Sequence, residues 1–277
     1  MKSILSIITV SYGQAQQVRA LLQSLKKFPP SVAWELLVVD NHSPKPQQYD
    51  FLKSEKNTHL IELHHNIGFG KGNEEAVRFA QGNILAFINP DVEVQKNCLD
   101  ELLTALKKEK NIGITAPVLC TKDGRPLENT WDFPTFWGLL RRRLWKSPEI
   151  QKHNQENIKD VDWAQGSFLV MQKDFFCALG FDHRFFLFFE DTDLCRRTWR
   201  KKKKVVQVPT ARAYHTEHRL SGGHILTALF KRTFWIHLGS ACKYFWKYRN
   251  NDKGRITNLL HKIPRGGSPS QRTISQG

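Results

Sequence analysis

Two nearly continuous apolar runs stand near the start of the chain, "ILSIITV" at 4–10 and "WELLVVD" at 34–40. Such runs are typical of parallel strands that are covered on both faces. Between them, apolar side chains recur at the spacing of one helical face, at Val18, Leu21, Leu22, Leu25 and Phe28. The pattern predicts a strand, a helix and a second strand.

The alternation continues through the first half of the chain. Strands are predicted at 59–63, 83–90 and 112–119, and helices at 71–80 and 96–109. Repeated strand, helix and strand units favour right-handed crossovers and a mostly parallel sheet, so we expect an α/β fold. Ligands of such sheets bind beyond the carboxyl ends of the strands, where "SYGQ", "DNHSP", "HHNIGFGKGN" and "NPDVE" follow here. Ordinary turns need the same residue types, so these loops alone do not establish a site.

The second half of the chain is less regular. Aromatic residues and an arginine triplet mix at 128–150, and a polar loop is expected at 151–160. The stretch "KKKKVVQVPTARAYH" predicts a basic turn followed by a short strand. A helix rich in aromatic and basic residues is expected at about 224–249, and 263–277 has the Gly, Ser and Pro content of a mobile tail.

Composition adds a strong positive charge to this picture. Of the 277 residues, 40% are hydrophobic and 25% are charged, as in soluble globular proteins. The net charge of +16 favours an anionic partner, which could be nucleic acid, an anionic membrane surface or a phosphorylated substrate. Five scattered cysteines without a C-x-x-C pair are typical of reduced thiols, and no apolar stretch reaches the roughly 18 to 20 residues of a membrane span. The N-terminus resembles a strand more than a signal peptide, so we expect a cytoplasmic protein that is soluble or peripherally bound.

Asn89 and Asp91, in "NPDVE", directly follow an apolar strand. Their side chains could project into the ligand crevice, where a carboxylate suits Mg²⁺ or Mn²⁺. Aspartate is also a good helix cap, so a helix start is the alternative. His215 follows a later strand and could complete a metal site beside Asp91, with His218 as the competing candidate.

Gly68, Gly70 and Gly72 precede a predicted helix in "NIGFGKGNEEA". Glycines at the start of a helix allow backbone amides to approach a phosphate closely. Their spacing matches neither the dinucleotide fingerprint nor the P-loop, which disfavours both of those enzyme classes. A flexible turn remains the alternative.

Glu190, Asp191 and Asp193 stand directly behind five apolar residues in "FFLFFEDTDLCRR". A helix start would stabilise them, and Asp193 is spaced to reach Arg196 or Arg197. A carboxylate left against the phenylalanines would have a raised pKa, which suits a general base that removes a proton from a hydroxyl. These residues leave the structural and the catalytic roles equally open.

Taken together and in order, these motifs resemble family 2 glycosyltransferases of the GT-A fold, and especially their bacterial rhamnosyltransferase-like branch. The resemblance is carried by "SIITVSY", "LLVVDNHS", "NIGFGKGN", "FINPDVE", "WAQGSFLVMQKDFFCALGFDHRFFLFFEDTDLCRR" and "VVQVPTARAYH". It covers about 1–220 and implies a catalytic domain there, with a nucleotide-binding half at about 1–120 and an acceptor half at about 121–220. A basic aromatic helical segment at 221–262 and the tail at 263–277 would follow.

The resemblance also implies a role for each matching residue. Asp191 would be the catalytic base, and Asp91 with His215 would bind a divalent metal, Mg²⁺ or Mn²⁺, that bridges the diphosphate of the donor. The donor-binding residues would be Ser11, Tyr12, Asp40, Gly70, Lys71, Asn73, Asn89 and Asp91. The acceptor side would be formed by Trp163, Gln165, Gly166 and Glu190.

The reaction implied by the resemblance is a single displacement that inverts the anomeric carbon. The leading donor is dTDP-rhamnose, with UDP-linked galactose, glucose or N-acetylated hexoses as alternatives. The acceptor would be a saccharide or lipid-linked saccharide in the assembly of lipopolysaccharide, O-antigen or another surface polysaccharide. Two departures matter: Asn89 replaces the first acid of the usual Asp-x-Asp motif, so metal binding rests more on Asp91, and no second asparagine follows Asn73, which leaves the donor open.

The predicted C-terminal helix has an aromatic face. Counted at 100° per residue from Leu226, that face carries Phe230, Phe234, Ala241, Tyr244, Phe245 and Tyr248. Trp235 and Trp246 break the pattern. The face could pack on the catalytic domain, or lie on the cytoplasmic face of the inner membrane, where anionic lipids would attract the positive charge.

Two other classes of protein are weighed against an enzyme. A nucleic-acid-binding protein is disfavoured because no binding module is recognisable and the acidic crevice motifs would repel a phosphate backbone. An inactive scaffold or sugar-binding protein with the same fold remains an alternative, since fold does not determine function.

Overall fold

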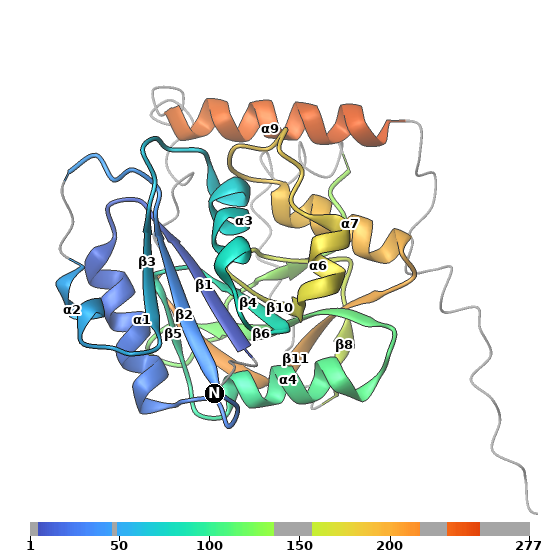
Figure 1. Ribbon diagram of the computed structural model, residues 1–277. Coiled ribbons are helices and arrows are strands. Elements are labelled where there is room, and N and C mark those ends of the chain that lie inside the picture. The colour runs from blue at the N-terminus through green and yellow to red at the C-terminus, as the bar shows by residue number, and fades with distance from the viewer. Residues whose placement is uncertain (1–4, 46–48, 136–156, 217–231, 250–277) are drawn as a thin grey trace, which may run out of the picture.

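The computed structural model describes residues 5–45, 49–135, 157–216 and 232–249, which form a nine-stranded mixed sheet and a separate strand pair (Figure 1). In spatial order the sheet contains β3 (Thr58–Glu62), β2 (Trp34–Asp40), β1 (Leu5–Ser11), β4 (Ile84–Ile88), β10 (Phe168–Gln172), β6 (Ile112–Cys120), β11 (Lys204–His215) and β5 (Val92–Val94), and β8 (Lys159–Asp160) pairs with β11. The separate pair is β7 (Thr130–Trp131) with β9 (Trp163–Ala164).

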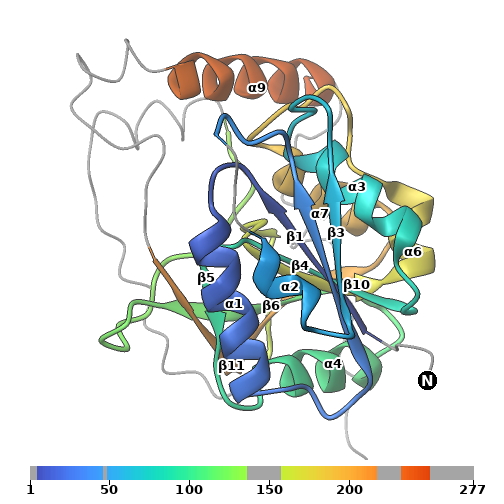
Figure 2. The same cartoon turned by 60° about the vertical axis from the view of Figure 1, so that its left-hand side comes forward.

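Helices cover both faces of the sheet, which gives the three layers expected of an α/β fold (Figure 2). One face packs against α1 (Ala15–Lys27) and α4 (Cys98–Lys108). The other packs against α3 (Phe69–Phe79), α6 (Lys173–Leu179) and α7 (Glu190–Arg200). The short α2 (Asp50–Lys53) contacts β3. The apolar stripes of these helices supply the core, which confirms the predicted α/β class.

The sheet is parallel in its first half and mixed in its second. β1, β2, β3 and β4 pair in parallel, as predicted from their apolar runs. β10 then inserts antiparallel between β4 and β6, an arrangement that was not predicted. β11 has 12 residues and is longer than the short strand expected there.

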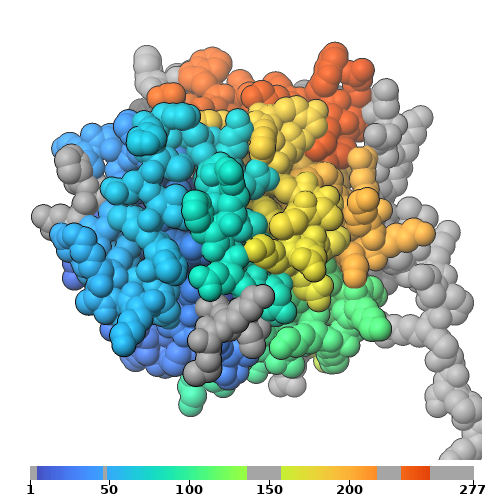
Figure 3. All heavy atoms as spheres, viewed as in Figure 1, coloured from blue at the N-terminus to red at the C-terminus, as the bar shows by residue number. Residues whose placement is uncertain are grey.

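A helix, α9 (Arg232–Tyr248), lies across the edge of the sheet where the parallel strands end (Figure 1). In the space-filling view it rests directly on the segment that precedes α7 (Figure 3). Ala241, Tyr244 and Tyr248 of the predicted aromatic face are buried there, so that face packs on the domain. Leu226, Phe230 and the predicted tail at 263–277 lie outside the described residues, as does the arginine triplet at 141–143. Among the helices that the structure describes, none combines the length and the hydropathy that crossing a membrane requires.

Candidate active site

Residues from three strands meet at the carboxyl edge of the sheet. Ser11 and Asp40, the last residues of β1 and β2, are paired in register. β4 runs beside β1 in the same direction, with Ile8 opposite Phe87. The loop that begins at Asn89 therefore leaves the sheet nearly level with Ser11 and Asp40.

Asp91 lies in the turn between β4 and β5, and it contacts the end of β11. The Nε2 atom of His215 lies 3.3 Å from Oδ2 of Asp91. The amide of Thr216 donates to the carbonyl of Asp91 (3.1 Å), and the pairing of Val92 with His215 holds the two segments together. The residue after Asp91 begins a strand, so the alternative that Asp91 caps a helix is wrong. The structure thus brings Asp91 and His215 together, while His218 lies outside the described residues.

Several buried side-chain oxygens near this turn have no hydrogen-bond partner among the described residues. They are Oδ1 of Asn89, Oδ1 of Asp91 and Oγ of Ser167. Oε2 of Glu190, a residue of helix α7 (Glu190–Arg200), is a further buried oxygen without a partner in the described part of the chain. A buried oxygen without a partner costs about 1–3 kcal/mol, so proteins keep few of them without a functional reason. Asn89 and Ser167 are neighbours, because the amide of Asn89 donates to the carbonyl of Ser167 (2.8 Å). These atoms mark a place prepared for a polar ligand.

The donor atoms at this turn fit a hard divalent cation. Asp91 and Asn89 each offer an unpaired oxygen, and His215 adds a ring nitrogen beside Asp91. Mg²⁺ is commonly held by one or two carboxylates together with water and substrate phosphates. Within the described ranges no cluster of three or more His, Cys, Asp or Glu side chains could hold a metal by itself. A metal at Asp91 would therefore depend on further oxygens from a diphosphate and from water.

The start of α7 is built from a strained backbone. Phe188 and Phe189 have φ angles of 68° and 70°, in the left-handed region that bulky residues rarely adopt. Each such residue costs about 1–3 kcal/mol and persists only where the surroundings enforce it. This strained turn delivers Glu190 and Asp191 to the first turn of the helix, as the sequence predicted for the acids.

Asp191 is held in place but remains partly accessible. Its Oδ2 accepts from the amide of Gly166 (2.8 Å), and its Oδ1 accepts from the amide of Thr192 (2.6 Å). Burial raises the pKa of Asp191, and these hydrogen bonds limit the rise. Burial, and then the charge of Asp191, raise the pKa of Glu190 well above its ordinary value. Asp191 is therefore a carboxylate with an increased proton affinity, as a general base requires.

Gly166 leaves the space that Asp191 occupies. A Cβ at this position would lie 3.2 Å from Cβ of Asp191 and 3.4 Å from its Oδ2. Gly166 also precedes Ser167, whose carbonyl is bonded to the amide of Asn89. The loop before β10 thus connects the turn of Asn89 and Asp91 to the candidate base.

Asp193 has a structural environment that differs from that of Asp191. It is fully buried, and Arg197 Nε and the hydroxyl of Tyr248 each donate to it at 2.7 Å. Lys247 also contacts it. The predicted contact of Asp193 with Arg197 is confirmed. Of these two aspartates, Asp193 is structural and Asp191 is partly accessible.

The predicted donor residues on β1 and β2 occupy one corner of the site. Tyr12 is 48% exposed just beyond β1. Asp40 Oδ1 accepts from the amide of Ser43 (3.1 Å) and from its hydroxyl (2.5 Å). Ser11 is buried, and its Oγ accepts from the hydroxyl of Tyr49 (2.9 Å). Asp40 and Ser11 therefore have protein partners in this structure, whereas Tyr12 faces solvent.

The glycine segment forms the first turn of α3, and protein atoms fill the space beside its glycines. A Cβ on Gly68, whose φ is 90°, would collide with the carbonyl of Phe186, and one on Gly70 would lie 2.9 Å from Cβ of Phe181. Asn73 is buried and donates to the carbonyl of Phe69 (2.9 Å), while Lys71 is exposed. The glycines allow close packing here, and Lys71 is the side chain of the segment that a ligand can reach.

Trp163 and Gln165 lie on the other side of Gly166. The indole of Trp163 stacks on Trp131 with centroids 4.5 Å apart, and its Nε1 donates to the carbonyl of Asp132 (3.1 Å). Gln165 is tied through its amide to the carbonyl of Asn129 (2.9 Å). Gln165 is partly accessible and directly precedes Gly166, which donates to Asp191, and β9, which contains Trp163, contacts α7.

Two residues of the site were missed by the sequence reasoning. Asn41 donates to Asn66 Oδ1 and to the carbonyl of Gly68 (both 3.1 Å), and it accepts from the amide of Ile67 (3.0 Å). It therefore fastens the loop after β2 to the glycine segment. Ser167, with its unpaired hydroxyl, is the second. Asn41 directly follows the apolar strand β2, and Ser167 directly precedes β10. A polar residue next to an apolar strand is the signal that could have identified each of them.

The family model described as Glycosyl transferase family 2 matches residues 6–175. The chain is 26% identical over 276 residues to the rhamnosyltransferase WbbL of Escherichia coli K12, covering 92% of this chain and 98% of that protein. It is 27% identical over 218 residues to the low-salt glycan biosynthesis hexosyltransferase Agl10 of Haloferax volcanii, covering 77% and 67%. It is also 25% identical to the N-acetylglucosaminyl-diphospho-decaprenol L-rhamnosyltransferase of Mycobacterium tuberculosis H37Rv, covering 89% and 88%.

Solved structures share the fold at low sequence identity. GalNAc-T7 with UDP, GalNAc and Mn²⁺ superposes with a TM-score of 0.60 at 18% identity, covering 77% of this chain and 44% of that one. The mannosyltransferase PcManGT of Pyrobaculum calidifontis with GDP-Man and Mn²⁺ superposes with a TM-score of 0.57 at 14% identity, covering 94% and 79%. The chain thus spans less than half of the GalNAc-T7 chain.

Proposed function

The chain belongs to glycosyltransferase family 2 and has the GT-A fold, and we propose that it transfers a sugar with inversion from a nucleoside diphosphate donor to a saccharide acceptor. The observation that carries this proposal is that two consecutive residues hold both parts of the site. The amide of Gly166 donates to Asp191, and the carbonyl of Ser167 accepts from the amide of Asn89, in the turn where Asn89 and Asp91 have unpaired oxygens. Asp191 is suited to remove a proton, and Asn89 with Asp91 is suited to bind a diphosphate through a cation.

In the proposed reaction Asp191 accepts the proton of the acceptor hydroxyl. The acceptor oxygen forms a bond to the anomeric carbon, while the bond from that carbon to the diphosphate oxygen breaks and the nucleoside diphosphate leaves. A single displacement needs one base and no nucleophile from the enzyme, so the configuration inverts. Glu190, whose pKa is raised by burial and by the charge of Asp191, lies beside the base and would border the acceptor.

We assign the divalent metal to Asp91 and His215, with Asn89 beside them. When bound there, Mg²⁺ or Mn²⁺ would neutralise the charge that develops on the departing diphosphate. The donor base and ribose would lie over the corner of Tyr12, Ser11 and Asp40. Ser43 donates to Oδ1 of Asp40, and Oδ2 would accept from the N–H of the base. Mn²⁺ is named with the two similar structures above, which supports a metal in this fold.

The sugar and the acceptor are proposed from the relatives. Two of them are named as rhamnosyltransferases, so dTDP-rhamnose is our leading donor, followed by UDP-hexoses. One relative is named for a diphospho-decaprenol substrate, which supports a lipid-linked saccharide as acceptor. A protein that serves such an acceptor would bind peripherally to the cytoplasmic face of the inner membrane. We assign the catalytic domain to 1–220, followed by a helical segment. The protein would act in the assembly of a surface polysaccharide.

A screen of sugar nucleotides tests the proposal. The purified chain would be incubated with dTDP-rhamnose and with UDP-hexoses, with Mn²⁺, with Mg²⁺ or with a chelator, and release of the nucleoside diphosphate would be measured with and without saccharide acceptors. We expect one donor to be consumed in a metal-dependent way, with an inverted product, and Asp91→Ala to raise the metal concentration needed. An inactive GT-A scaffold, the competing function, would bind a nucleotide and release nothing with any donor.

A further inference from the structure

The two faces of α9 have different environments. Its inner face is anchored to the domain: the hydroxyl of Ser240 donates to the carbonyl of Leu187 (2.8 Å), Arg196 donates to the hydroxyl of Tyr244 (2.6 Å), and Lys247 donates to Asp182 (2.6 Å). These three side chains of the inner face thus have hydrogen-bond partners in the domain. The position of α9 is therefore set by the domain, and its outer face is held in a fixed orientation.

The outer face is aromatic and apolar at its centre. Trp235 is 57% exposed, Leu238 is 43% exposed and Trp246 is 72% exposed. Cys242 is also exposed, and the steps of three and four residues place all four on one face of the helix. Large apolar side chains that are exposed and clustered on one face of a helix mark an interaction surface.

Positive charges border this apolar centre. Arg232, Lys243 and Arg249 are exposed on α9 or at its end, and α9 itself contains no acidic residue. The guanidinium of Arg249 lies 3.9 Å from the ring centroid of Trp246. Indole rings surrounded by cations are the composition of helices that lie in the interface of an anionic bilayer, with the rings at the level of the headgroups.

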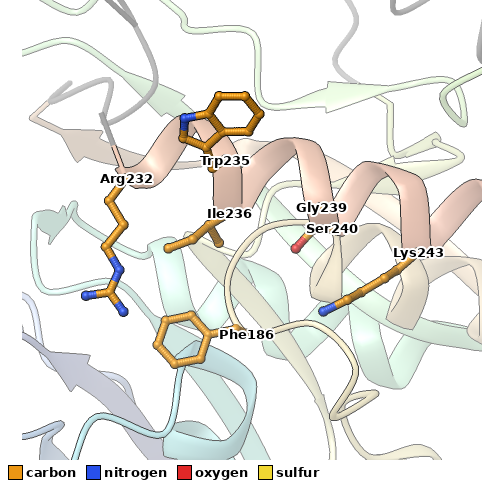
Figure 4. A pocket seen from close by; sticks show the side chains of 7 residues that line it. All are labelled: Phe186, Arg232, Trp235, Ile236, Gly239, Ser240 and Lys243. Atoms are coloured by element: carbon orange, nitrogen blue, oxygen red, sulfur yellow. The ribbon is translucent and has the colours of Figure 1, made fainter. Parts of the chain in front are cut away.

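A cavity of about 390 Å³ opens at the rim of the same face, between α9 and Phe186. Figure 4 shows Arg232 extending beside the ring of Phe186, with Lys243 further along the helix and Trp235 on the opposite side of α9 from Phe186. Nζ of Lys243 donates to the carbonyl of Arg184 (2.9 Å), and Arg232 with the apolar wall fits the phosphate and the first carbons of a phospholipid.

The outer face lies at the same end of the molecule as the candidate active site. Tyr244 packs against Phe189 with ring centroids 5.2 Å apart, and Phe189 directly precedes Glu190. Phe186 accepts a hydrogen bond from the amide of Phe69, at the start of the glycine segment (2.9 Å). A membrane that touches α9 would therefore lie at the end of the molecule that carries the candidate active site.

We propose that the outer face of α9, formed by Trp235, Leu238, Cys242 and Trp246 with Arg232, Lys243 and Arg249 around it, docks on an anionic phospholipid bilayer. The indole rings lie at the boundary of headgroups and acyl chains, and the cations lie on lipid phosphates. The complementary occupant is negative because this face has no carboxylate to attract a positive one, and the chain carries a net charge of +16. This inference deepens the peripheral location proposed above by naming the surface, but the docking itself does not require glycosyl transfer.

Vesicle binding by the full chain tests the inference. Large vesicles of phosphatidylcholine alone, and vesicles with about 30% phosphatidylglycerol, would be sedimented with the protein at low and at high ionic strength. We expect binding to the anionic vesicles that weakens in salt. Replacing both indoles, by Trp235→Ser with Trp246→Ser, should lower the partition constant at least about tenfold. Replacing Arg232→Gln with Arg249→Gln should lower it about tenfold for anionic vesicles only.

Matched variants at the opposite edge of the sheet serve as controls. Phe79, at the end of α3, is 60% exposed, and Arg78 is exposed beside it. Phe79→Ser and Arg78→Gln should leave vesicle binding unchanged, and circular dichroism should show that all variants are folded. The inference is overturned if the natural chain ignores anionic vesicles, if the double tryptophan variant binds as well as the natural chain, or if Phe79→Ser reduces binding equally.

Two further readouts separate this inference from its alternatives. If the outer face joined two copies of the chain, light scattering would show a dimer that the double tryptophan variant converts to a monomer with unchanged vesicle binding, and docking on lipid would be wrong. Release of nucleoside diphosphate from a soluble donor separates docking from catalysis. If vesicle binding follows the expected pattern while no donor is consumed, the proposed function fails and the docking surface stands.

Discussion

Gly166→Ala tests whether the position of Asp191 matters as a catalytic base would require. The added methyl carbon would lie 3.2 Å from Cβ of Asp191 and 3.4 Å from Oδ2. Unstrained carbon atoms stay about 3.5–4.0 Å apart, so Asp191 must move by a few tenths of an ångström. The amide of residue 166 is retained, and no positive φ is involved, so the perturbation is steric.

The size of the effect follows from this displacement. A misplacement of about 1 Å can cost about a hundredfold in rate, so a shift of a few tenths should lower kcat about tenfold. Crowding in a packed region costs about 1–3 kcal/mol, which for a chain of this size lowers Tm by about 5 °C. Binding of the donor should change little, because our proposal assigns Gly166 to the acceptor side of the site.

Gly113→Ala is the matched control, since it crowds a buried glycine at a distance from the base. Its Cβ would lie 2.7 Å from Cγ2 of Thr198 and 2.8 Å from atoms of Lys203 and Phe175. It should lower Tm by at least as much as Gly166→Ala and leave kcat of the folded protein unchanged. The assay is release of nucleoside diphosphate with the donor and acceptor identified by the screen, together with thermal unfolding. Equal loss of kcat in both variants, or full kcat in Gly166→Ala, would refute the reasoning.

The remaining predictions concern the other carboxylates. Asp193→Asn breaks a buried ion pair with Arg197 and should lower the free energy of unfolding by about 3–5 kcal/mol, measured by denaturant titration; a loss below about 1 kcal/mol would contradict its structural role. Burial raises the folded pKa of Glu190 above its ordinary 4.5, so the stability that its protonated form provides is fully present below pH 4.5 and is lost as the pH rises. Glu190→Gln should therefore gain stability at pH 7 and not at pH 4, measured by denaturant titration at both pH values. Burial pushes the pKa of Asp182 up, but hydrogen bonds from Arg184 and Lys247 hold it well below the ordinary 3.8. The stabilisation it provides is fully present above pH 3.8 and is lost progressively as the pH falls towards the folded pKa. Lys247→Met should therefore cost stability at pH 7, and the cost should shrink steadily below pH 3.8.

The first strands and helices were predictable because their signals are local. The runs at β1 and β2 are apolar throughout, since both faces of these strands are covered, and α1 shows its buried stripe in its spacing. The insertion of β10 between β4 and β6 could not be read from the chain, because the order of strands depends on pairings between distant segments. The three residues of β5 are too few to form a pattern.

For α9 the sequence predicted the aromatic face correctly but did not determine whether that face packs on the domain. The face with Tyr244 and Tyr248 was predicted, and Trp235 and Trp246 were seen to break it. Which face turns inward depends on Asp193 and Arg196, which bond to the two tyrosines from far away in the sequence. The tryptophans that broke the pattern are the ones that face outward.

The candidate site was predictable where a motif ends a strand. The proximity of Asp91 and His215 was expected and is observed, because β5 and β11 pair beside them. The different environments of Asp191 and Asp193 were not predictable, because Asp191 accepts from the distant Gly166 and Asp193 accepts from Tyr248 of α9. The glycine segment suggested contact with a ligand, but its spaces are filled by Phe181 and Phe186, which only the fold brings there.

Asp191→Asn, examined for donor binding and for turnover on the same preparation, separates the base from every other role of the site. The amide keeps the shape and accepts the bond from Gly166, but it cannot take a proton from a hydroxyl. The dissociation constant of the nucleoside diphosphate sugar in Mn²⁺ should stay within about threefold, while kcat falls about 10²- to 10⁴-fold. Turnover at the natural rate, or loss of donor binding as large as the loss of kcat, would contradict the assignment of Asp191 as the group that deprotonates the acceptor.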